Sequence, residues 1–537
     1  MSGAPRRGGG GGYAVRLLLL AFFAVAVILP LICMLTNIDR ESLGRVVRSE
    51  QFRVGALHSL AVSLTATAIS IGVAFLLSWS LARTGIRYKS VIAVLLTVPM
   101  LVPSISHSTG LIMLFGSNGF FTKLLGMQGS IYGFWGIVLG SVMYSFPFAF
   151  LMLYDVMRYE DYTPYEAAQV LGIPKWKQLR DITFSYLKKP MISVLFSTFT
   201  IIFTDYGVPI AIGGKYVTLP VIMYQEVIGQ LNFAKGSVIG AVLLLPAVIS
   251  FLIDTLAKDK GRAAYITKPY LIKSSPLRDR CAGAFCLAVC LYILFVNLSF
   301  GVLAFARSYP TDMSFTLANV QKAFQMNGLR YLGNSLAIAL LVAALGTTVG
   351  FTAAYCSARL PSALSRWLHL SVITSLAIPG IVLGISYVLF FKSTALYGTL
   401  LLLVMVNIAH FAASPYLMMY NTFGKMNANL EAVGDTLGIS RLRLVLDVFI
   451  PQVKNTLLEM ASYLFVNSMI TISAVSFLAT TVNKPLSLMM NQFDALMLTE
   501  CSAVISVLLL GINLAVKCVV WLLKRKTAVH SDCEQFV

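Results

Sequence analysis

Residues 165–173 read Tyr-Glu-Ala-Ala-Gln-Val-Leu-Gly-Ile, and residues 430–439 read Leu-Glu-Ala-Val-Gly-Asp-Thr-Leu-Gly-Ile. The glycines near the ends of these stretches, Gly172 and Gly438, are 266 residues apart in a chain of 537. Ten residues after each glycine an apolar quartet begins, at Ile182 and at Val448. A spacing of half the chain indicates two homologous halves. Each copy is a short polar stretch between long apolar ones, so we expect the repeated element to carry function.

The composition indicates a membrane protein. Apolar residues make up 58% of the chain and charged residues 12%, whereas soluble domains carry about 25% charged residues. A helix needs roughly 20 apolar residues to cross about 30 Å of hydrocarbon. The sequence predicts an all-α polytopic fold with about 12 transmembrane helices, six in each half. The predicted spans are 14–35, 56–82, 90–115, 132–155, 191–213 and 237–257, followed by 281–306, 332–358, 367–391, 397–420, 456–479 and 498–523.

The distribution of basic residues predicts that both termini are cytoplasmic. With the N-terminus inside, most of the 41 Lys and Arg residues fall on the cytoplasmic side, as the positive-inside rule requires. The exception is the loop after the first span, which holds four arginines. The net charge of +19 then reflects orientation in the membrane and not nucleic-acid binding, because the basic residues are dispersed over loops without interleaved aromatic residues.

The repeated element predicts two short helices that meet at a glycine. In the first copy Thr163 is a suitable N-cap, and Glu166 three residues later completes a capping box. Gly172 supplies the left-handed residue that ends this helix, and Pro174 begins the second helix. In the second copy the corresponding positions are Asn429, Gly438 and Ser440.

An Ala- and Glu-rich helix is by itself an ordinary connector, because both residues favour any helix. Three further observations favour a functional role. Both copies follow the fourth span of their half, both lie on the predicted cytoplasmic side, and both keep the same spacing to the apolar quartet.

Such loops resemble those of the permease subunits of binding-protein-dependent ATP-binding-cassette importers. The family's hallmark is Glu-Ala-Ala, three residues, Gly, nine residues and then Ile-x-Leu-Pro. The chain is similar over nearly its whole length to two such subunits in tandem, as in the fused ferric-iron, thiamine and aminoalkylphosphonate permeases. The resemblance implies two six-helix type I importer permease units, residues 1–262 and 281–537, with a cytoplasmic linker over 263–280.

In this family the loop docks into a groove on a separate ATPase subunit. The resemblance therefore implies coupling loops near 158–190 and 424–456. The first copy ends Ile182-Thr183-Phe184-Ser185 without the Leu-Pro, and the second has Ala432, Val433 and Gly434 where Glu-Ala-Ala is expected, with Glu431 one position early. The residues that inherit a role in ATPase coupling are Glu166, Ala167, Ala168, Leu171, Gly172 and Pro174, and Glu431, Gly434, Leu437, Gly438 and Pro451.

The chain is not expected to hydrolyse ATP. The Gly-Lys pairs at 214–215 and 424–425 lack both the preceding glycine and the following Ser or Thr of a phosphate-binding loop. We therefore expect no enzyme activity and no cofactor on this chain, with ATP and magnesium bound by two partner ATPase subunits. The other implied partners are an external solute-binding protein and the lipid bilayer, with no nucleic acid, in the bacterial cytoplasmic (inner) membrane. Transport would proceed by alternating access of the two repeated bundles.

The translocation pathway is expected where polar or irregular residues occur at membrane depth. Asp205, Tyr206 and Gly207 lie in the fifth span, and Thr471 and Ser473 lie in the matching part of the eleventh. An acid at this depth predicts a functional site, and a structural pairing is an equally open reading. The glycine also predicts a break in the helix. The solute stays open among ferric iron, thiamine, an aminoalkylphosphonate, a polyamine or another molecule.

Two other classes were weighed. A secondary active transporter of six plus six helices fits the composition, but its loops should not repeat after spans four and ten. A membrane enzyme needs a concentrated set of intramembrane acids and histidines, and Asp205 is nearly alone. No metal site is expected, because the five histidines are scattered and several cysteines lie within apolar spans.

Overall fold

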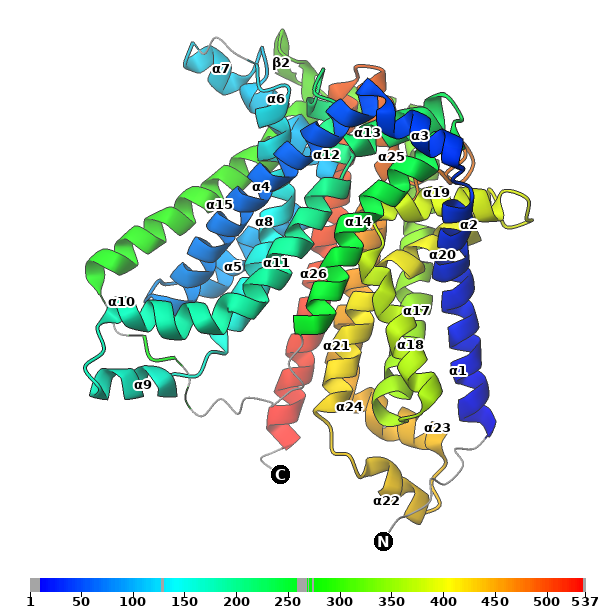
Figure 1. Ribbon diagram of the computed structural model, residues 1–537. Coiled ribbons are helices and arrows are strands. Elements are labelled where there is room, and N and C mark those ends of the chain that lie inside the picture. The colour runs from blue at the N-terminus through cyan, green and yellow to red at the C-terminus, as the bar shows by residue number, and fades with distance from the viewer. Residues whose placement is uncertain (1–9, 127–129, 258–267, 269, 273–274, 535–537) are drawn as a thin grey trace. The chain divides into compact units, whose positions relative to one another are not determined.

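The computed structural model describes residues 10–126, 130–257, 268, 270–272 and 275–534 (Figure 1). Part of the predicted linker over 263–280 lies outside these residues. The described chain is mostly helical, with one antiparallel pair of strands, β1 (Ala306–Ser308) and β2 (Asp312–Phe315). The predicted all-α polytopic class is confirmed. The chain forms two compact units: the first unit comprises residues 39–326 and 489–508, and the second unit comprises 1–38, 327–488 and 509–537.

The first unit contains most of the first half of the chain. Besides the loop helices described below, its helices are α3 (Arg40–Arg48), α4 (Glu50–Arg83), α5 (Lys89–Thr97), α6 (Ser104–Phe115), α7 (Phe120–Leu124), α8 (Phe134–Arg158), α11 (Ser185–Thr204), α12 (Gly207–Ile212), α13 (Leu219–Tyr224), α14 (Phe233–Ala257), α15 (Pro276–Ala304) and α16 (Ala318–Ala323).

The second unit contains most of the second half. Its helices are α1 (Gly10–Phe23), α2 (Leu29–Thr36), α17 (Leu329–Arg359), α18 (Ala363–Thr374), α19 (Gly380–Phe391), α20 (Leu400–Phe411), α21 (Ala413–Gly424) and α24 (Ile450–Ile470). Helices α25 (Ser487–Ala495) and α26 (Thr499–Glu534) each contribute residues to both units.

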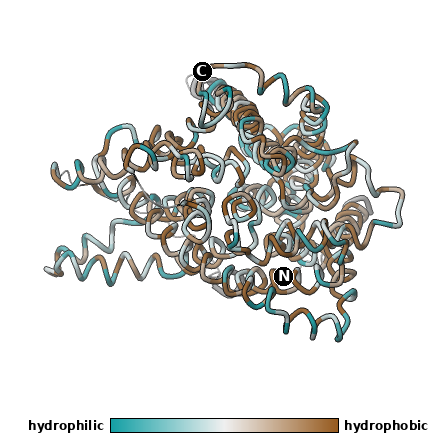
Figure 2. Tube along the Cα trace, turned by 90° about the horizontal axis from the view of Figure 1, so that it is seen from above, coloured by the Kyte–Doolittle hydropathy of each residue, from teal (hydrophilic) through white to brown (hydrophobic). Residues whose placement is uncertain are grey.

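Eight helices of the described chain are long and apolar enough to cross a membrane, and three bent pairs raise the number to 11. Apolar residues recur along these helices (Figure 2). Two of the pairs bend by 100° and 111°, at Pro103 and at Pro379, because proline cannot continue the hydrogen-bond pattern of a helix. Helix α24 is not among the 11; Lys454, Asn455 and Glu459 interrupt its first half.

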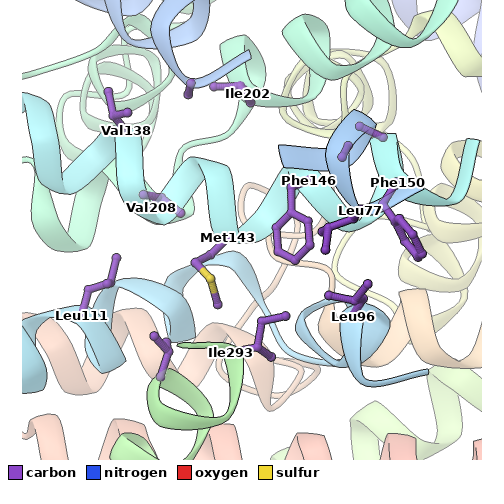
Figure 3. Packing of buried hydrophobic residues seen from close by; sticks show 14 of the residues in the cluster. Leu77, Leu96, Leu111, Val138, Met143, Phe146, Phe150, Ile202, Val208 and Ile293 are labelled. Carbon is purple, nitrogen blue, oxygen red and sulfur yellow. The ribbon is translucent and has the colours of Figure 1, made fainter. Parts of the chain in front are cut away.

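The core of the first unit includes a helix from the second half of the chain. Met143, Phe146 and Phe150 of α8 pack with Leu77 of α4 (Figure 3). Ile293 of α15, the first span of the second half, is part of the same cluster. Close packing of this kind fixes helix positions more strongly than hydropathy alone.

The second unit includes the first span of the chain. The Tyr387 hydroxyl of α19 donates to the carbonyl oxygen of Ala26, at 2.6 Å. Arg16 of α1 donates to the Ser362 hydroxyl at the start of α18, at 3.2 Å. Each compact unit therefore holds the first span of the other half of the sequence. The boundaries 1–262 and 281–537 stay a prediction about the sequence repeat.

Candidate functional site

Each copy of the repeated element folds as two short helices beyond the ends of the long ones (Figure 1). In the first unit these are α9 (Thr163–Val170) and α10 (Lys175–Gln178). In the second unit they are α22 (Leu430–Thr436) and α23 (Arg441–Leu444). A π-helical turn follows each pair, over Leu179–Phe184 and Val445–Phe449. We call these elements the first loop and the second loop.

The turn between the short helices has the same geometry in both loops. Gly172 has φ +67° and Gly438 has φ +69°, a conformation that favours glycine. The residue after each glycine donates its N–H across the turn to the fifth residue before it, at 2.9 Å in both loops. This bond is that of a Schellman motif, and the predicted glycine turn is confirmed. The bonds are Ile173 N to Ala168 O and Ile439 N to Gly434 O.

The predicted capping box at the start of the first loop is wrong. Thr163 is the first helical residue and not the N-cap, because Asp161 accepts its N–H at 3.1 Å. Glu166 instead receives a hydrogen bond from the Lys268 ammonium, at 2.8 Å. In the second loop Ser440 does cap α23, accepting from the N–H of Arg443.

Apolar side chains lie exposed at matching positions of the two loops. Leu171 and Leu437, directly before the glycines, are 74% and 68% exposed. Four residues after the glycines, Trp176 and Leu442 are 71% and 70% exposed. Large exposed apolar side chains in a repeated arrangement are typical of a protein interaction site. Of the other predicted coupling residues, Ala168 and Gly434 are buried, Glu166 and Glu431 are intermediate, and Ala167, Gly172, Pro174, Gly438 and Pro451 are exposed.

A buried arginine ties the first loop to the end of α4. Arg83, the last residue of α4, forms an ion pair with Glu160, and the two side chains are 2% and 3% exposed. The Tyr165 hydroxyl of α9 donates to the other oxygen of Glu160, at 2.7 Å. The guanidinium carbon of Arg83 lies 3.5 Å from the ring centre of Tyr270.

Arg359, the last residue of α17, ties the second loop to the end of that helix. Arg359 donates through Nε and Nη2 to the Glu431 carboxylate, at 2.7 and 2.5 Å. It also donates to the backbone carbonyls of Asn427 and Met426, at 2.7 and 3.3 Å. Glu431 therefore holds the second loop to α17, and its side chain is only 15% exposed. The sequence alone does not distinguish Arg83 and Arg359 from the other basic residues of the cytoplasmic side, although each directly follows the second predicted span of its half.

The helix break predicted at Gly207 is present in the first unit, and the second unit has an equivalent break that was not predicted. Helix α11 ends at Thr204 and α24 at Ile470. The next residues are extended, with φ −73° and ψ 132° at Asp205 and φ −63° and ψ 136° at Thr471. The break interrupts both helices at the same place in the repeat.

The carboxylate of Asp205 is engaged inside the protein. One oxygen accepts from the Ser104 hydroxyl at 2.8 Å, and the other accepts from the N–H of Val208 at 3.0 Å. The second contact caps the short helix α12. The structure thus supports the structural reading of this acid. Thr471 accepts through its backbone carbonyl from the Ser487 hydroxyl, at 2.7 Å.

The residues after the break pack against the kinked third span in a reciprocal way. A Cβ on Gly207 would lie 2.3 Å from the Ser104 hydroxyl at the start of α6. A Cβ on Gly380 at the start of α19 would lie 2.4 Å from the Ser473 hydroxyl. Each unit thus pairs one glycine with one serine, on opposite sides of the same contact. Between Asp205 and Gly207, Tyr206 is buried, and its hydroxyl accepts from the Asn491 amide at 3.0 Å.

Within the described ranges, no group of three or more His, Cys, Asp or Glu side chains could hold a metal ion. The charged side chains that position the two loops form ion pairs. The hydrogen bond from Lys268 to Glu166 raises the pKa of the lysine, so the ammonium stays charged at neutral pH. The two loops therefore have exposed apolar tips, formed by Leu171 with Trp176 and by Leu437 with Leu442, and each unit contains one helix break.

The chain belongs to the family described as the binding-protein-dependent transport system inner membrane component. The family pattern matches twice, over residues 66–260 and 346–529. The tandem arrangement of a fused permease is thus confirmed.

Three relatives share the arrangement at low identity. The ferric transport system permease protein FbpB of Actinobacillus pleuropneumoniae is 23% identical over 76% of this chain, and the match covers 62% of its length. A putative ferric transport system permease protein FbpB 1 of Haemophilus influenzae is 23% identical over 71% of this chain and 63% of its own. The thiamine transport system permease protein ThiP of Haemophilus influenzae is 24% identical over 67% of this chain and 68% of its own. The matches thus span less than two thirds of the length of the two ferric-transport relatives.

Proposed function

We propose that this chain is the transmembrane permease of an ATP-binding-cassette importer, which moves a small solute inward by alternating access. The observation that carries the proposal is the pair of loops with the same glycine turn and the same exposed apolar residues. Leu171 matches Leu437 and Trp176 matches Leu442 in sequence position and in exposure. Two equivalent docking tips suit two copies of one partner, since an ATPase pair presents the same groove twice.

The loops would receive the work of ATP hydrolysis. Each tip would seat in a groove of one of two cytoplasmic ATPase subunits, which bind ATP and magnesium. An external solute-binding protein would deliver the solute on the other side of the bilayer. In this proposal the chain lies in the bacterial cytoplasmic membrane with both termini inside, and its two permease units are residues 1–262 and 281–537.

The helix breaks would line the pathway. Extended backbone at membrane depth is tolerated where it is buried in protein or lines a cavity, and both units have such a break at equivalent positions. We propose that the solute passes near residues 205–207 and 471–473, with Asp205 shaping the break by capping α12. The relatives named for ferric and thiamine transport favour a small solute carried by a binding protein.

The proposal is tested by reconstituting the chain in lipid vesicles with and without its ATPase partners. Alone, the chain should hydrolyse no ATP. With partners, it should retain them through purification, and Leu171→Glu with Leu437→Glu should abolish that retention. Leu317→Glu, at a leucine that is 59% exposed and outside both loops, is the matched control. ATPase retention by the double variant would show that the two leucines are not the docking site, and solute uptake driven by an ion gradient without ATP would favour a secondary active transporter.

A further inference from the structure

Each loop is tied to the second span of its own unit by the arginine that ends that span. We infer that Arg83 and Arg359 are positioning residues through which movement of the loops α9–α10 and α22–α23 reaches α4 and α17. This inference rests on the proposed function, because it assigns a path for work delivered at the loops. Neither arginine lies on the exposed tips, so the role differs from docking.

The burial of these ion pairs suits them to carry force. Arg83 and Glu160 are almost completely buried, and Arg359 is 6% exposed. Separating such a pair leaves a charge without its partner in a medium of low polarity, so the two helices it joins tend to move together. The loops also carry an exposed pair, Arg443 with Asp447. An exposed pair of this kind is held weakly and resists little.

The two units make the same link with different residues. By the spacing of the repeat, Met426 occupies the position of Glu160, and Glu431 occupies that of Tyr165. Arg83 bonds directly to the carboxylate at the first position, and the tyrosine hydroxyl at the second position donates to the other oxygen of that carboxylate. Arg359 reaches the first position through a backbone carbonyl and the second through a carboxylate. The arginine at the end of the second span thus recurs, and the same two loop positions take part in the link in both units, directly in the second unit and through Glu160 in the first.

Each arginine also faces an aromatic ring on the loop side. The guanidinium carbon of Arg83 lies over Tyr270, and that of Arg359 lies 5.4 Å from the ring centre of Phe449. Phe449 ends the π-helical turn that leads from α23 into α24. The arginine thus joins the second span to the entry of the loop and, in the second unit, to its exit.

The test follows nucleotide-driven changes in hydrogen–deuterium exchange of the complete complex in lipid. The probe is ATP with vanadate, so no transported solute has to be known. In the wild type, the nucleotide should change exchange in α22 and in the last turns of α17. In Arg359→Gln the change in α22 should persist, whereas the change in α17 should fall about tenfold. Arg83→Gln should do the same for α9 and α4.

The controls separate the possible failures. Arg359→Lys keeps a cationic donor and should retain most of the α17 response, and Arg278→Gln removes an exposed cation outside the loops and should change neither response. If Arg359→Gln does not fold, Glu431→Gln breaks the same pair while leaving the carbonyl contacts. A full α17 response in the Gln variants overturns the inference. A wild-type complex without any response in α9 and α22 overturns the proposed function itself, and the inference with it.

Discussion

The carboxylate of Glu431 lies 2.5 Å from the guanidinium of Arg359, in the sequence position that Tyr165 has in the first loop. The acid that most resembles the family glutamate in the second loop is therefore an internal anchor. In the first loop Glu166 instead pairs with Lys268 at the surface. The two glutamates are near neighbours in the repeat and differ in environment, so their substitutions should differ in effect.

Replacing Glu431 by Gln should destabilise the second loop far more than replacing Glu166 by Gln destabilises the first. Breaking a buried pair costs about 3 kcal/mol, whereas an exposed pair contributes under about 1 kcal/mol. The measurement is protection from hydrogen exchange over α22 and α9 in each variant. Equal losses of protection would contradict the assignment of Glu431 as an anchor.

Lys268 holds the first loop through its backbone and through its ammonium, which donates to both oxygens of Glu166. Its backbone N–H donates to Asp161 and its carbonyl accepts from Tyr162 N–H, in addition to the bond from its ammonium to Glu166. Lys268→Gln should lower the protection of α9 moderately, because the two backbone bonds remain. Lys175→Gln, at an exposed lysine of α10, serves as the comparison, and an equal effect there would show that the Glu166 pair adds nothing.

The pair of Lys268 with Glu166 should stabilise the first loop equally at all pH values between 6 and 9. The folded-state pKa of Lys268 is raised above its usual value of 10.5, so the stabilisation is complete below pH 10.5 and is lost as the pH rises through the higher folded value. Protection factors of α9, corrected for intrinsic exchange, should be equal at pH 6 and pH 9. A decline over this interval would show that another group controls the contact.

Gly172 and Gly438 should tolerate Asn better than Ala, and Ala better than Arg. A Cβ would meet nothing within 4 Å at either position, so the obstacle is the left-handed backbone, which costs most L residues about 1 kcal/mol and Asn less. An arginine adds bulk at the docking tip. ATPase retention and uptake are measured together, and wild-type coupling in both Arg variants would show that the loops are ordinary connectors.

The contact between residues 207 and 104 has room for a side chain on one of the two residues but not on both. Gly207→Ala overfills it and should destabilise the first unit by about 1–3 kcal/mol. Adding Ser104→Gly reproduces the arrangement of Gly380 with Ser473 and should recover part of the loss, but not the hydrogen bond from Ser104 to Asp205. Thermal unfolding of the single and double variants measures both effects. Additive losses in the double variant would contradict the reciprocal packing.

Asp205→Asn should weaken the cap of α12. Asparagine has one acceptor oxygen for the three donors that the carboxylate serves, so we expect a loss of about 1 kcal/mol and a larger loss for Asp205→Ala. Uptake per folded complex should stay close to that of the wild type, and ATPase retention should persist. A fall in uptake beyond the loss of folded protein would place the carboxylate in the solute pathway.

Local features were readable from the sequence because local chemistry decides them. A glycine before a proline-led helix fixed the turn at Gly172, and a proline fixed the bends at Pro103 and Pro379. The roles of Arg83 and Arg359 were not readable, because a basic residue at the end of a span also serves orientation in the membrane. Only the fold shows which acid or carbonyl the arginine meets.

The partners of the spans were not readable either. Hydropathy says that a helix crosses the membrane but not which helix it packs against, since every lipid-facing surface is equally apolar. The sequence repeat therefore predicted six helices for each half, and the compact units instead hold α15 with the first half and α1 with the second. The reciprocal Gly–Ser contacts could not be predicted either, because they depend on which helices pack against each other.

The exchange of first spans sets an order for biogenesis. Helix α1 is synthesised early relative to its packing partners: Tyr387 and Ser362, which hold it in the second unit, follow more than 300 residues later. At about 5–20 residues per second, the helix stays in the bilayer for tens of seconds before its packing partners exist. The insertion machinery must therefore keep α1 in the membrane without its final neighbours until the second half has been made.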